Sequence, residues 1–522
     1  MRRFREALAA AQPSTSEGRR WLYVPYDQLT DAVGPLSEPA PHTLGIVMVE
    51  SADKARRRPY HKQKLQWVLA NGRHFALEQA RRGVAVDFRA GSAPIADQLR
   101  LAIHEHGPLE VRRPAEYELR RELAPLLADG SLVELDHGGW LTTDADFDGL
   151  GDAPWRMDVF YRRVRKRTGI LMEGKKPVGG RYSFDGDNRE PWSGDPPAPD
   201  IPTFEVDPIA AEVAELVSVR FADHPGQLVP DTVPSTREHA EALWTWAKTA
   251  CMTHFGPYED AMSVVSRNVF HTRVSPLVNL GRLQPLRIVD DVLALDIPMS
   301  SKEGFVRQII GWREFVRHIH ERTEGFTALP AGYRREHLGE GIPLPPALWG
   351  EAKSGLHCLD HVVEGVWAEG YSHHITRLMI LSNLATLLDL SPEALSDWFW
   401  VAYVDAYDWV VQPNVLGMGT FSLGDLMTTK PYVSGSAYID KMSDYCAGCR
   451  FHPKKTCPIT PLYWSFLGRN EATLREVDRM KLVMGSLRRR SEAKRKLDAA
   501  TLRWVQETLA EGRELDPADR PR

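Results

Sequence analysis

Four cysteines have spacings that could form a metal centre. Three lie within twelve residues, in CAGCRFHPKKTC, and the fourth lies far upstream, in SGLHCLD: Cys446, Cys449, Cys457 and Cys358. Thiolates from a loop and a second element can surround a zinc ion or a 4Fe-4S cluster, and in a zinc site His357 or His452 could replace one of them. Four unrelated free thiols are the remaining possibility. The fifth cysteine, Cys251, follows a helical pattern and is expected to be a buried thiol.

A histidine pair and an aromatic stretch are the other groups that could do chemistry. His373 and His374 are adjacent in a helical pattern, so their side chains are expected to point about 100° apart. One could act as a general acid while the other packs. The stretch DWFWVAYVDAYDWVVQPN is either an aromatic core helix or a path for electrons, because indole and phenol rings are readily oxidised. Asp405 within it would need a partner if buried, and Arg377 is the obvious candidate.

The elements that must position these residues are of two kinds. Short β-rich runs alternate with helical segments over about the first 140 residues, which predicts a Rossmann-like parallel α/β sheet. From Pro208 onward the periodicity is mostly helical, and a stretch rich in Gly, Pro and Asp precedes it. We expect an N-terminal extension at 1–20, an α/β domain at 21–145, a connector at 146–207, a helical domain at 208–445, and a cysteine loop with C-terminal helices at 446–522.

The composition excludes several classes of protein. The 522 residues are 43% hydrophobic and 26% charged, which indicates a globular chain of several domains. A net charge of −5 excludes a polycation that coats nucleic acid, although a local basic face is still possible. No apolar run reaches the ~18 residues of a membrane span, and five cysteines are too few for a secreted disulfide scaffold. We therefore expect a cytoplasmic protein with no membrane partner, and a poorly ordered segment before the first strand.

No common nucleotide-binding or hydrolase motif stands in a persuasive context. GxGxxG, P-loop, GxSxG and HExxH patterns are all missing from the positions where they would carry chemistry. Hydride transfer on a Rossmann domain, P-loop phosphoryl transfer and serine hydrolysis are therefore disfavoured.

Long blocks of the chain resemble the iron-sulfur bacterial cryptochromes and photolyases, the prokaryotic branch that includes (6-4) photolyases. The blocks run in order over nearly the whole chain: MDVFYRRVRKRTGILMEGKKPVGGRYSFD, FVRQIIGWREF, SHHITRLM, DAYDWVVQPNVLGMG, TKPYVSGSAYIDKMSDYCAGC and LYWSFLGRN. The resemblance implies a photolyase/cryptochrome fold, with an α/β antenna domain and a large all-α domain that binds FAD. It also implies a 4Fe-4S cluster on the four cysteines and decides against zinc. The seven-residue loop before Cys457 is shorter than in relatives.

The resemblance also assigns roles in light-driven repair of UV-damaged DNA. In such enzymes reduced flavin donates an electron under light, while the protein positions a flipped-out lesion and supplies protons. His374 matches the catalytic proton donor, His373 supports it, and Tyr432 and Tyr438 match tyrosines of the lesion pocket. Flavin contacts are expected from nine residues: His271, Ser275, Asn279, Gln308, Trp312, Arg313, Arg377, Asp405 and Val411. Relatives can carry a polar or acidic group at position 411, whereas valine cannot exchange a proton with flavin N5.

A path for electrons is expected beside the flavin. Trp398 matches the nearest tryptophan of the photoreduction pathway, Tyr407 a further redox aromatic, and Trp349 the outer step. Phe399 replaces a tyrosine of relatives and is far harder to oxidise. We therefore expect the path to bypass Phe399, with Trp400 as the candidate.

An antenna chromophore is implied as well. The resemblance suggests 6,7-dimethyl-8-ribityllumazine, bound by Asp27 and Glu50, with His61 and Lys64 close in sequence. The stretch YVPYDQL departs from the ILGDQL that is usual in the family.

Three functions follow from these features. The first is a monomeric, light-dependent (6-4) photolyase. The second is a cryptochrome-like photoreceptor without repair activity, favoured by Val411, Phe399 and the short cysteine loop. The third, a cyclobutane-dimer photolyase, is disfavoured because the histidine pair is surplus to that reaction. DNA contacts are expected from basic residues of the connector and the cysteine loop: Arg162, Arg163, Arg165, Lys166, Arg167, Lys454 and Lys455.

Overall fold

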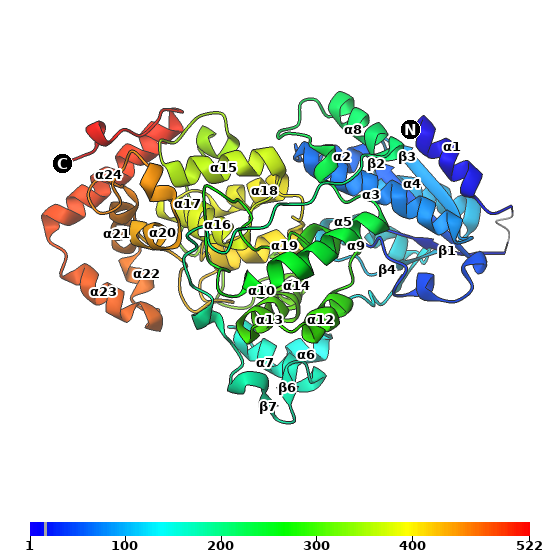
Figure 1. Cartoon of the computed structure of the whole chain (residues 1–522), viewed down its shortest axis with the longest axis horizontal. Coiled ribbons are helices and arrows are strands. Elements are labelled where there is room, and N and C mark those ends of the chain that lie inside the picture. Colours follow the sequence, from blue (N-terminus) through cyan, green and yellow to red (C-terminus); the bar gives the residue numbers. More distant parts are fainter. Residues whose placement is uncertain (15–17) are drawn as a thin grey trace.

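A parallel sheet forms the N-terminal domain of the computed structural model, which describes residues 1–14 and 18–522 (Figure 1). Its order is β3-β2-β1-β4-β5, so the chain winds outward in both directions from β1. The strands are β1 (Arg20–Tyr23), β2 (Leu44–Ser51), β3 (Ala85–Gly91), β4 (Leu109–Arg112) and β5 (Leu132–Leu135). The helices are α2 (Ala52–Arg56), α3 (Lys62–Arg81), α4 (Ile95–His106) and α5 (Tyr117–Ala128). The expected Rossmann-like α/β sheet is confirmed.

Alternating side chains of β1 explain why both faces of the sheet are covered. Leu22 belongs to the core that includes α3, whereas Trp21 and Tyr23 belong to a separate core with α4 and α5. A strand that is apolar on both faces needs helices on both sides, which is the arrangement of a doubly wound sheet. In such sheets ligands bind at the carboxyl ends of the strands.

Most of the segment before β1 is not the poorly ordered extension that the sequence suggested, and residues 15–17 of it lie outside the described part of the chain. Residues 2–11 form helix α1 (Arg2–Ala11), and Phe4 and Leu8 are buried against the domain. The ring of Phe4 meets Phe88 of β3 at 4.6 Å. Phe4 and Leu8 are spaced i, i+4 and therefore share one face of α1. The arginines around Phe4 make this apolar face hard to recognise in the sequence.

The connector holds a small folded unit that projects from the body of the molecule (Figure 1). It consists of α6 (Asp144–Asp148), α7 (Met157–Thr168), a two-stranded hairpin of β6 (Met172–Glu173) and β7 (Lys176–Pro177), and the 3-10 turn η4 (Asp185–Asp187). Phe160 and Val164 on the inner face of α7 are fully buried. An extended run then returns to the α/β domain, where α8 (Pro208–Arg220) packs on α3.

The rest of the chain is helical and lies on the opposite side of the molecule from the sheet (Figure 1). Its central helices are α9 (Arg237–Trp246), α10 (Met252–Phe255), α11 (Ser275–Leu280), α12 (Pro285–Ala294), α13 (Met299–Val306), α14 (Glu314–Arg322), α15 (His357–Glu369), α16 (His374–Thr376), α17 (Asn383–Leu387), α18 (Pro392–Ala402) and α19 (Asp408–Gln412). The C-terminal helices are α20 (Ser436–Met442), α21 (Ile459–Arg469), α22 (Glu471–Leu474), α23 (Lys481–Arg488) and α24 (Glu492–Ala510). None of the helices in the described part of the chain is long and apolar enough to cross a membrane.

Several of these helices are interrupted by π-helical turns. The turns are η6 (Ala247–Cys251), η7 (Arg307–Arg313), η9 (Arg377–Ser382) and η10 (Pro413–Gly419). Turns of this kind are rare and are frequent at functional sites. Four of the expected flavin residues, from Gln308 to Arg377, lie on η7 or η9.

Candidate active site

A buried ion pair lies at the centre of the helical domain. Arg377, the first residue of η9, forms two hydrogen bonds of 3.0 Å to the carboxylate of Asp405. Ser275 donates to the same carboxylate at 2.6 Å, and the side chain of Asn279 donates to the Asp405 carbonyl at 2.9 Å. The expected pairing of Arg377 with Asp405 is present, and four of the predicted flavin residues meet here.

The surroundings of Arg377 keep it charged despite its burial. Desolvation alone would lower the pKa of Arg377, but the Asp405 carboxylate and the neighbouring tyrosine Tyr403 outweigh it, so its pKa is raised. The guanidinium also lies 4.0 Å from the centroid of the Tyr403 ring, and its Nε donates to the Ser372 carbonyl at 2.8 Å. The result is a fixed, fully partnered charge at the wall of the site.

Three histidines from two elements gather next to this pair. His271 and His373 are buried and stack with centroids 4.2 Å apart at 9°, and His374 meets His271 edge-on at 5.3 Å. His374 is exposed, and its ring is inclined at 68° to that of His373, so the two neighbours face different surroundings. Desolvation lowers the pKa of His271 and His373 far below the ordinary value, which keeps both rings neutral.

The histidine cluster is poorly arranged for a metal ion. Its ligand atoms lie within 4.8 Å of one another. However, His271 and His373 lie in nearly parallel planes, so their in-plane lone pairs cannot converge on one ion. His271 Nε2 and His373 Nδ1 also lack hydrogen-bond partners. The geometry favours a wall that receives an organic ligand.

Two carboxylates that the sequence did not single out surround His374. The hydroxyl of Tyr438 lies 3.3 Å from Asp260 Oδ2 and donates to it. Although the outer edge of His374 is exposed, protein atoms surround the rest, so desolvation lowers its pKa while Asp260 acts in the opposite direction. Asp185 of η4 interacts electrostatically with His374, Tyr432 and Tyr438. The structure therefore brings the three expected lesion residues together around carboxylates from the α10–α11 segment and the connector.

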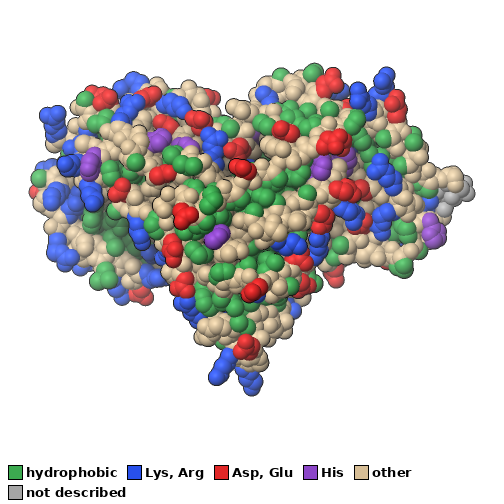
Figure 2. Space-filling view, in the orientation of Figure 1, with side chains coloured by type: hydrophobic (Ala, Val, Ile, Leu, Met, Phe, Trp, Pro, Cys, Tyr) green, Lys and Arg blue, Asp and Glu red, His purple; other side chains and the backbone are tan. Residues whose placement is uncertain are grey.

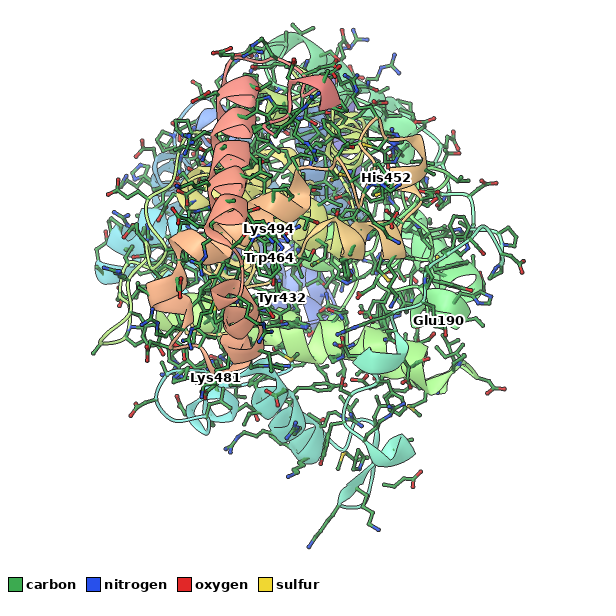
Figure 3. All side chains as sticks on the ribbon, turned by 90° about the vertical axis from the view of Figure 1, so that its left-hand side faces the viewer. Glu190, Tyr432, His452, Trp464, Lys481 and Lys494 are labelled. Atoms are coloured by element: carbon green, nitrogen blue, oxygen red, sulfur yellow. The ribbon has the colours of Figure 1, made fainter. Side chains whose placement is uncertain are left out.

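The face around Tyr432 is rich in basic residues. Figure 3 shows Tyr432 near the middle of this face, with Trp464 and Lys494 above it and Lys481 below it. Lysine and arginine side chains also gather at the left-hand edge of Figure 2, over the C-terminal helices. Arg479 and Arg189 both act electrostatically on the Tyr432 hydroxyl. Desolvation is the largest cause of the lowered pKa of Lys430, and the charge of Arg479 is the next.

The connector contributes less basic surface than the sequence suggested. Arg165 is fully buried, and its guanidinium donates to the carbonyls of Tyr182 and Ile170 at 2.9 and 3.2 Å. Arg165 is therefore a structural residue, and its assignment to DNA was wrong. Arg162 and Arg167 are paired with Asp158 and Asp146, at 3.0 and 2.5 Å. The remaining basic residues that the sequence assigned to DNA are exposed: Arg163, Lys166, Lys454 and Lys455.

The other predicted flavin residues lie in different surroundings. Gln308 donates to Glu259 at 2.7 Å, in a network with the Arg307–Asp185 ion pair. Trp312 packs edge-on against Phe315. Arg313 lies 4.0 Å from the ring centroid of Trp140 and lines a pocket of about 390 Å³ together with Asn279 and Asp27. Val411 is buried in α19.

The aromatic residues separate into two groups. Trp398 is buried and contacts Trp367, which in turn stacks on Trp349. Tyr407 instead stacks on Tyr26 of the α/β domain at 6.3 Å, and no ring contact joins it to Trp398 within the described residues. The structure thus does not join Tyr407 to the Trp398 path. Trp367 was missed because its sequence surroundings, HVVEGVWAE, are those of an ordinary helix.

The position of Trp400 bears on the expected bypass around Phe399. The ring of Trp400 lies beneath Arg58 at 3.7 Å and faces a pocket of the α/β domain. No ring contact connects it to Trp398 in the part of the chain that the structure describes. The ring contacts therefore do not support the bypass through Trp400, which stays a prediction.

The four cysteines come together from three segments. Cys358 lies in the first turn of α15, two cysteines lie in or just after the 3-10 turn η11 (Tyr445–Gly448), and Cys457 precedes α21. Desolvation, followed by the other three thiols, raises the pKa of Cys358. Among the described residues, the groups of three metal-ligand side chains whose ligand atoms lie within 4.8 Å contain no cysteine. Cys251 is fully buried, as expected, and burial raises its pKa to about 12.

A pocket with an empty volume of about 840 Å³ lies at the carboxyl ends of the strands. Its lining is mainly apolar, and its charged and polar residues include Tyr26, Glu50, Lys54, Lys64, Glu116 and Tyr407. Glu50 faces it while bound to Arg73 at 2.8 and 2.9 Å. Asp27 lines the other, smaller pocket, so the two expected antenna residues do not share one cavity.

Two residues at the start of α3 connect this pocket to the helical domain. Lys64 Nζ donates to the carbonyls of Trp400 and Ala406 at 2.7 and 2.6 Å, and desolvation lowers its pKa to about 7. The backbone N–H of His61 donates to the Val401 carbonyl at 3.0 Å. The pocket is therefore closed on one side by the helical domain.

The fold is that of the photolyase and cryptochrome class. A bacterial class III photolyase from Agrobacterium tumefaciens aligns with a TM-score of 0.58 at 15% identity, over 95% of this chain and 99% of its own. A cryptochrome from Synechocystis sp. PCC6803 aligns at 0.50 and 15%, over 77% and 82%. The expected photolyase/cryptochrome fold is confirmed.

Sequence comparison then gives the family. Residues 22–232 match the family described as deoxyribodipyrimidine photo-lyase-related protein. A (6-4) photolyase of Agrobacterium fabrum is 33% identical over 488 residues, which cover 89% of this chain and 95% of that protein. The chain belongs to this photolyase-related family, and the resemblance seen in the sequence is confirmed.

Proposed function

We propose that this protein is a light-dependent (6-4) photolyase that binds FAD and repairs pyrimidine-pyrimidone (6-4) photoproducts in DNA. The observation that carries the proposal is the exposed His374, placed between a buried neutral histidine pair and the Asp260–Tyr438 hydrogen bond. The proposal is further supported by the relationship to a (6-4) photolyase at 33% identity. It also accounts for the unpartnered nitrogens of His271 and His373, which a bound ligand could satisfy.

The residues beside the Arg377–Asp405 pair suit a flavin. Reduced FAD, when bound, would supply the electron that splits the lesion under light. Arg377 and Asp405 would fix the ring system in one orientation, since both are already held by Ser275, Asn279 and the Ser372 carbonyl. Because these contacts exist before any ligand arrives, little reorganisation is needed on binding.

His374 would donate a proton to the lesion from its exposed edge. Asp260 favours the protonated imidazole, and the Tyr438 hydroxyl orients Asp260. His373, buried and neutral, would hold the neighbouring ring in place through the stack with His271. Tyr432 and Tyr438 would contact the extruded bases, since aromatic rings and hydroxyls are suited to stacking and hydrogen bonding with a flipped nucleotide.

The cysteines suit a cluster of several irons better than one zinc ion. The four thiolates of a zinc site lie ~2.3 Å from the ion and therefore less than 4.8 Å from one another. Among the described residues, no three of these cysteine sulfurs lie within 4.8 Å of one another. We therefore assign a 4Fe-4S cluster to Cys358, Cys446, Cys449 and Cys457. The 840 Å³ pocket, with Glu50 at its rim, is the candidate antenna site for 6,7-dimethyl-8-ribityllumazine.

The test is repair by the purified, flavin-loaded and chemically reduced protein. Under blue light it should restore normal thymines in an oligonucleotide that carries one (6-4) photoproduct, and a cyclobutane-dimer oligonucleotide should stay unrepaired. His374→Asn should bind both DNA and flavin but not repair. DNA binding by the wild type without repair would exclude the proposal.

A cryptochrome-like photoreceptor is the second candidate. It is favoured by Val411, which is buried in α19, because valine, unlike the polar or acidic group that relatives can carry at this position, cannot exchange a proton with a flavin. This function predicts that light changes the hydrodynamic radius or partner binding of the flavin-loaded protein. Identical behaviour in light and darkness would count against it.

A further inference from the structure

Three indole rings form a line from the interior of the helical domain to its surface. The ring centroid of Trp398 in α18 lies 5.9 Å from that of Trp367 in α15, at 88°. Trp367 stacks on Trp349, the last residue of the 3-10 turn η8 (Pro346–Trp349), at 5.9 Å and 20°. Exposure rises along the line: Trp398 is 0% exposed, Trp367 is 9% exposed and Trp349 is partly exposed.

One backbone carbonyl fixes the geometry of the line. The indole N–H groups of Trp398 and Trp367 both donate to the carbonyl of Leu348, at 3.0 and 2.9 Å. Leu348 directly precedes Trp349, so a single turn positions all three rings. Trp367 also stacks on His61 at 5.7 Å and 5°. At Gly350 a Cβ would come within 3.0 Å of the Trp367 ring, so the chain passes closely over it.

The inner end of the line lies next to the Arg377–Asp405 pair. Trp398 contacts Tyr403 at 6.1 Å, and Tyr403 is the ring beneath the Arg377 guanidinium. Phe399 also touches Trp398, at 5.2 Å, but its other stacking partner is again Tyr403, at 5.2 Å. A route through Phe399 therefore leads back inward. The ring of Trp367, in contrast, connects Trp398 with the partly exposed Trp349.

We propose that Trp367 is the middle carrier of an electron relay from Trp349 to Trp398, which replaces a step through Phe399. The proposal rests on the proposed flavin site. With oxidised flavin bound and photoexcited, Trp398 would supply it with one electron. Trp367 would then reduce the oxidised Trp398, and Trp349 would reduce the oxidised Trp367. Trp349 then loses its indole proton to water and regains an electron, and a proton, from a dissolved thiol. Overall, one electron would pass from the thiol to the flavin, so the thiol would be oxidised and the flavin reduced.

The experiment compares tryptophan variants of the oxidised, flavin-loaded protein under blue light with a thiol present. Trp367→Phe should lose photoreduction as completely as Trp398→Phe, whereas Trp367→Tyr, which keeps an oxidisable ring, should retain part of it. Trp155→Phe is the matched control: its buried indole also donates to a backbone carbonyl, that of Gly151 at 3.0 Å, but it lies outside the line. This control should photoreduce like the wild type.

A second measurement locates the oxidised residue directly. Light-induced electron paramagnetic resonance without thiol should detect the tryptophan radical at the partly exposed Trp349 in the wild type. In Trp367→Phe the signal should be absent or confined to the buried, short-lived Trp398. Normal photoreduction by Trp367→Phe, while Trp398→Phe is inactive, would overturn the relay and leave the flavin site intact. A wild type that binds no flavin would instead refute the proposed function.

Discussion

Replacing Asp27 with asparagine should stabilise the protein at neutral pH but not at acid pH. The carboxyl is 6% exposed, and its Oδ1 has no hydrogen-bond partner. Burial, followed by the charge of Glu116, raises its pKa from 3.8 to about 7. At ~1.36 kcal/mol for each pH unit, the carboxyl costs the folded state about 4 kcal/mol once the pH exceeds 7.

The sign of the pH dependence follows from proton binding. Between pH 3.8 and about 7 the unfolded chain has released the Asp27 proton, whereas the folded chain retains it. The free energy of unfolding therefore falls as the pH rises through this window. Because asparagine does not ionise, the advantage of Asp27→Asn should grow from near zero to about 4 kcal/mol across the window and then stay constant.

The assay is urea unfolding, followed by far-ultraviolet circular dichroism at several pH values. Asp31→Asn in the same loop is the matched control. Burial alone would raise the pKa of Asp31, but hydrogen bonds from Arg237 and Gln79 outweigh it and lower its pKa. Its substitution should therefore destabilise the protein above pH 3.8, the opposite sign. An Asp27→Asn difference that does not change with pH would refute the reasoning.

Further predictions concern the active site, the cysteines and the DNA face. Asp260→Asn should move the alkaline loss of repair to lower pH, because it removes the carboxylate that raises the pKa of His374; initial repair rates against pH measure this, and an unchanged profile would contradict it. Cys449→Ala should lose bound iron and increase hydrogen exchange across 446–469, because cluster binding contributes to folding there; full iron content would show that the ligand assignment is wrong. Arg479→Gln should reduce the slope of log affinity for DNA against log salt by about 0.9 for each phosphate that is no longer neutralised, while Arg2→Gln on the distant α1 should not change the slope.

The main features that the sequence predicted are those with a strong local signal. Alternating short apolar runs predicted the sheet, because both faces of β1 are buried. The pairing of Arg377 with Asp405 followed from the cost of burying a lone carboxylate. The cysteine spacing predicted their clustering, although spacing alone could not choose the metal.

The features that the sequence missed depend on contacts between distant segments. The proposed role of Trp367 depends on its contacts with Leu348 and Trp398. These contacts form only after α15, α18 and η8 have packed together. Asp185 lies in a stretch that resembles a linker, yet it interacts electrostatically with His374 and Tyr432. Arg165 is basic in sequence, but the carbonyls that bind it belong to a turn that forms only in the folded connector.

The contacts at the start of α3 have a consequence for how the two domains can be separated. His61 both stacks on Trp367 and donates its backbone N–H to Val401, and Lys64 binds two carbonyls at and beyond the end of α18. The helical domain therefore relies on the α/β domain for part of its own interior. Cutting the chain between them would leave these carbonyls without donors and expose part of Trp367, so the α/β domain is not a detachable module. The position of that domain's large pocket relative to the helical domain is thus set when the chain folds.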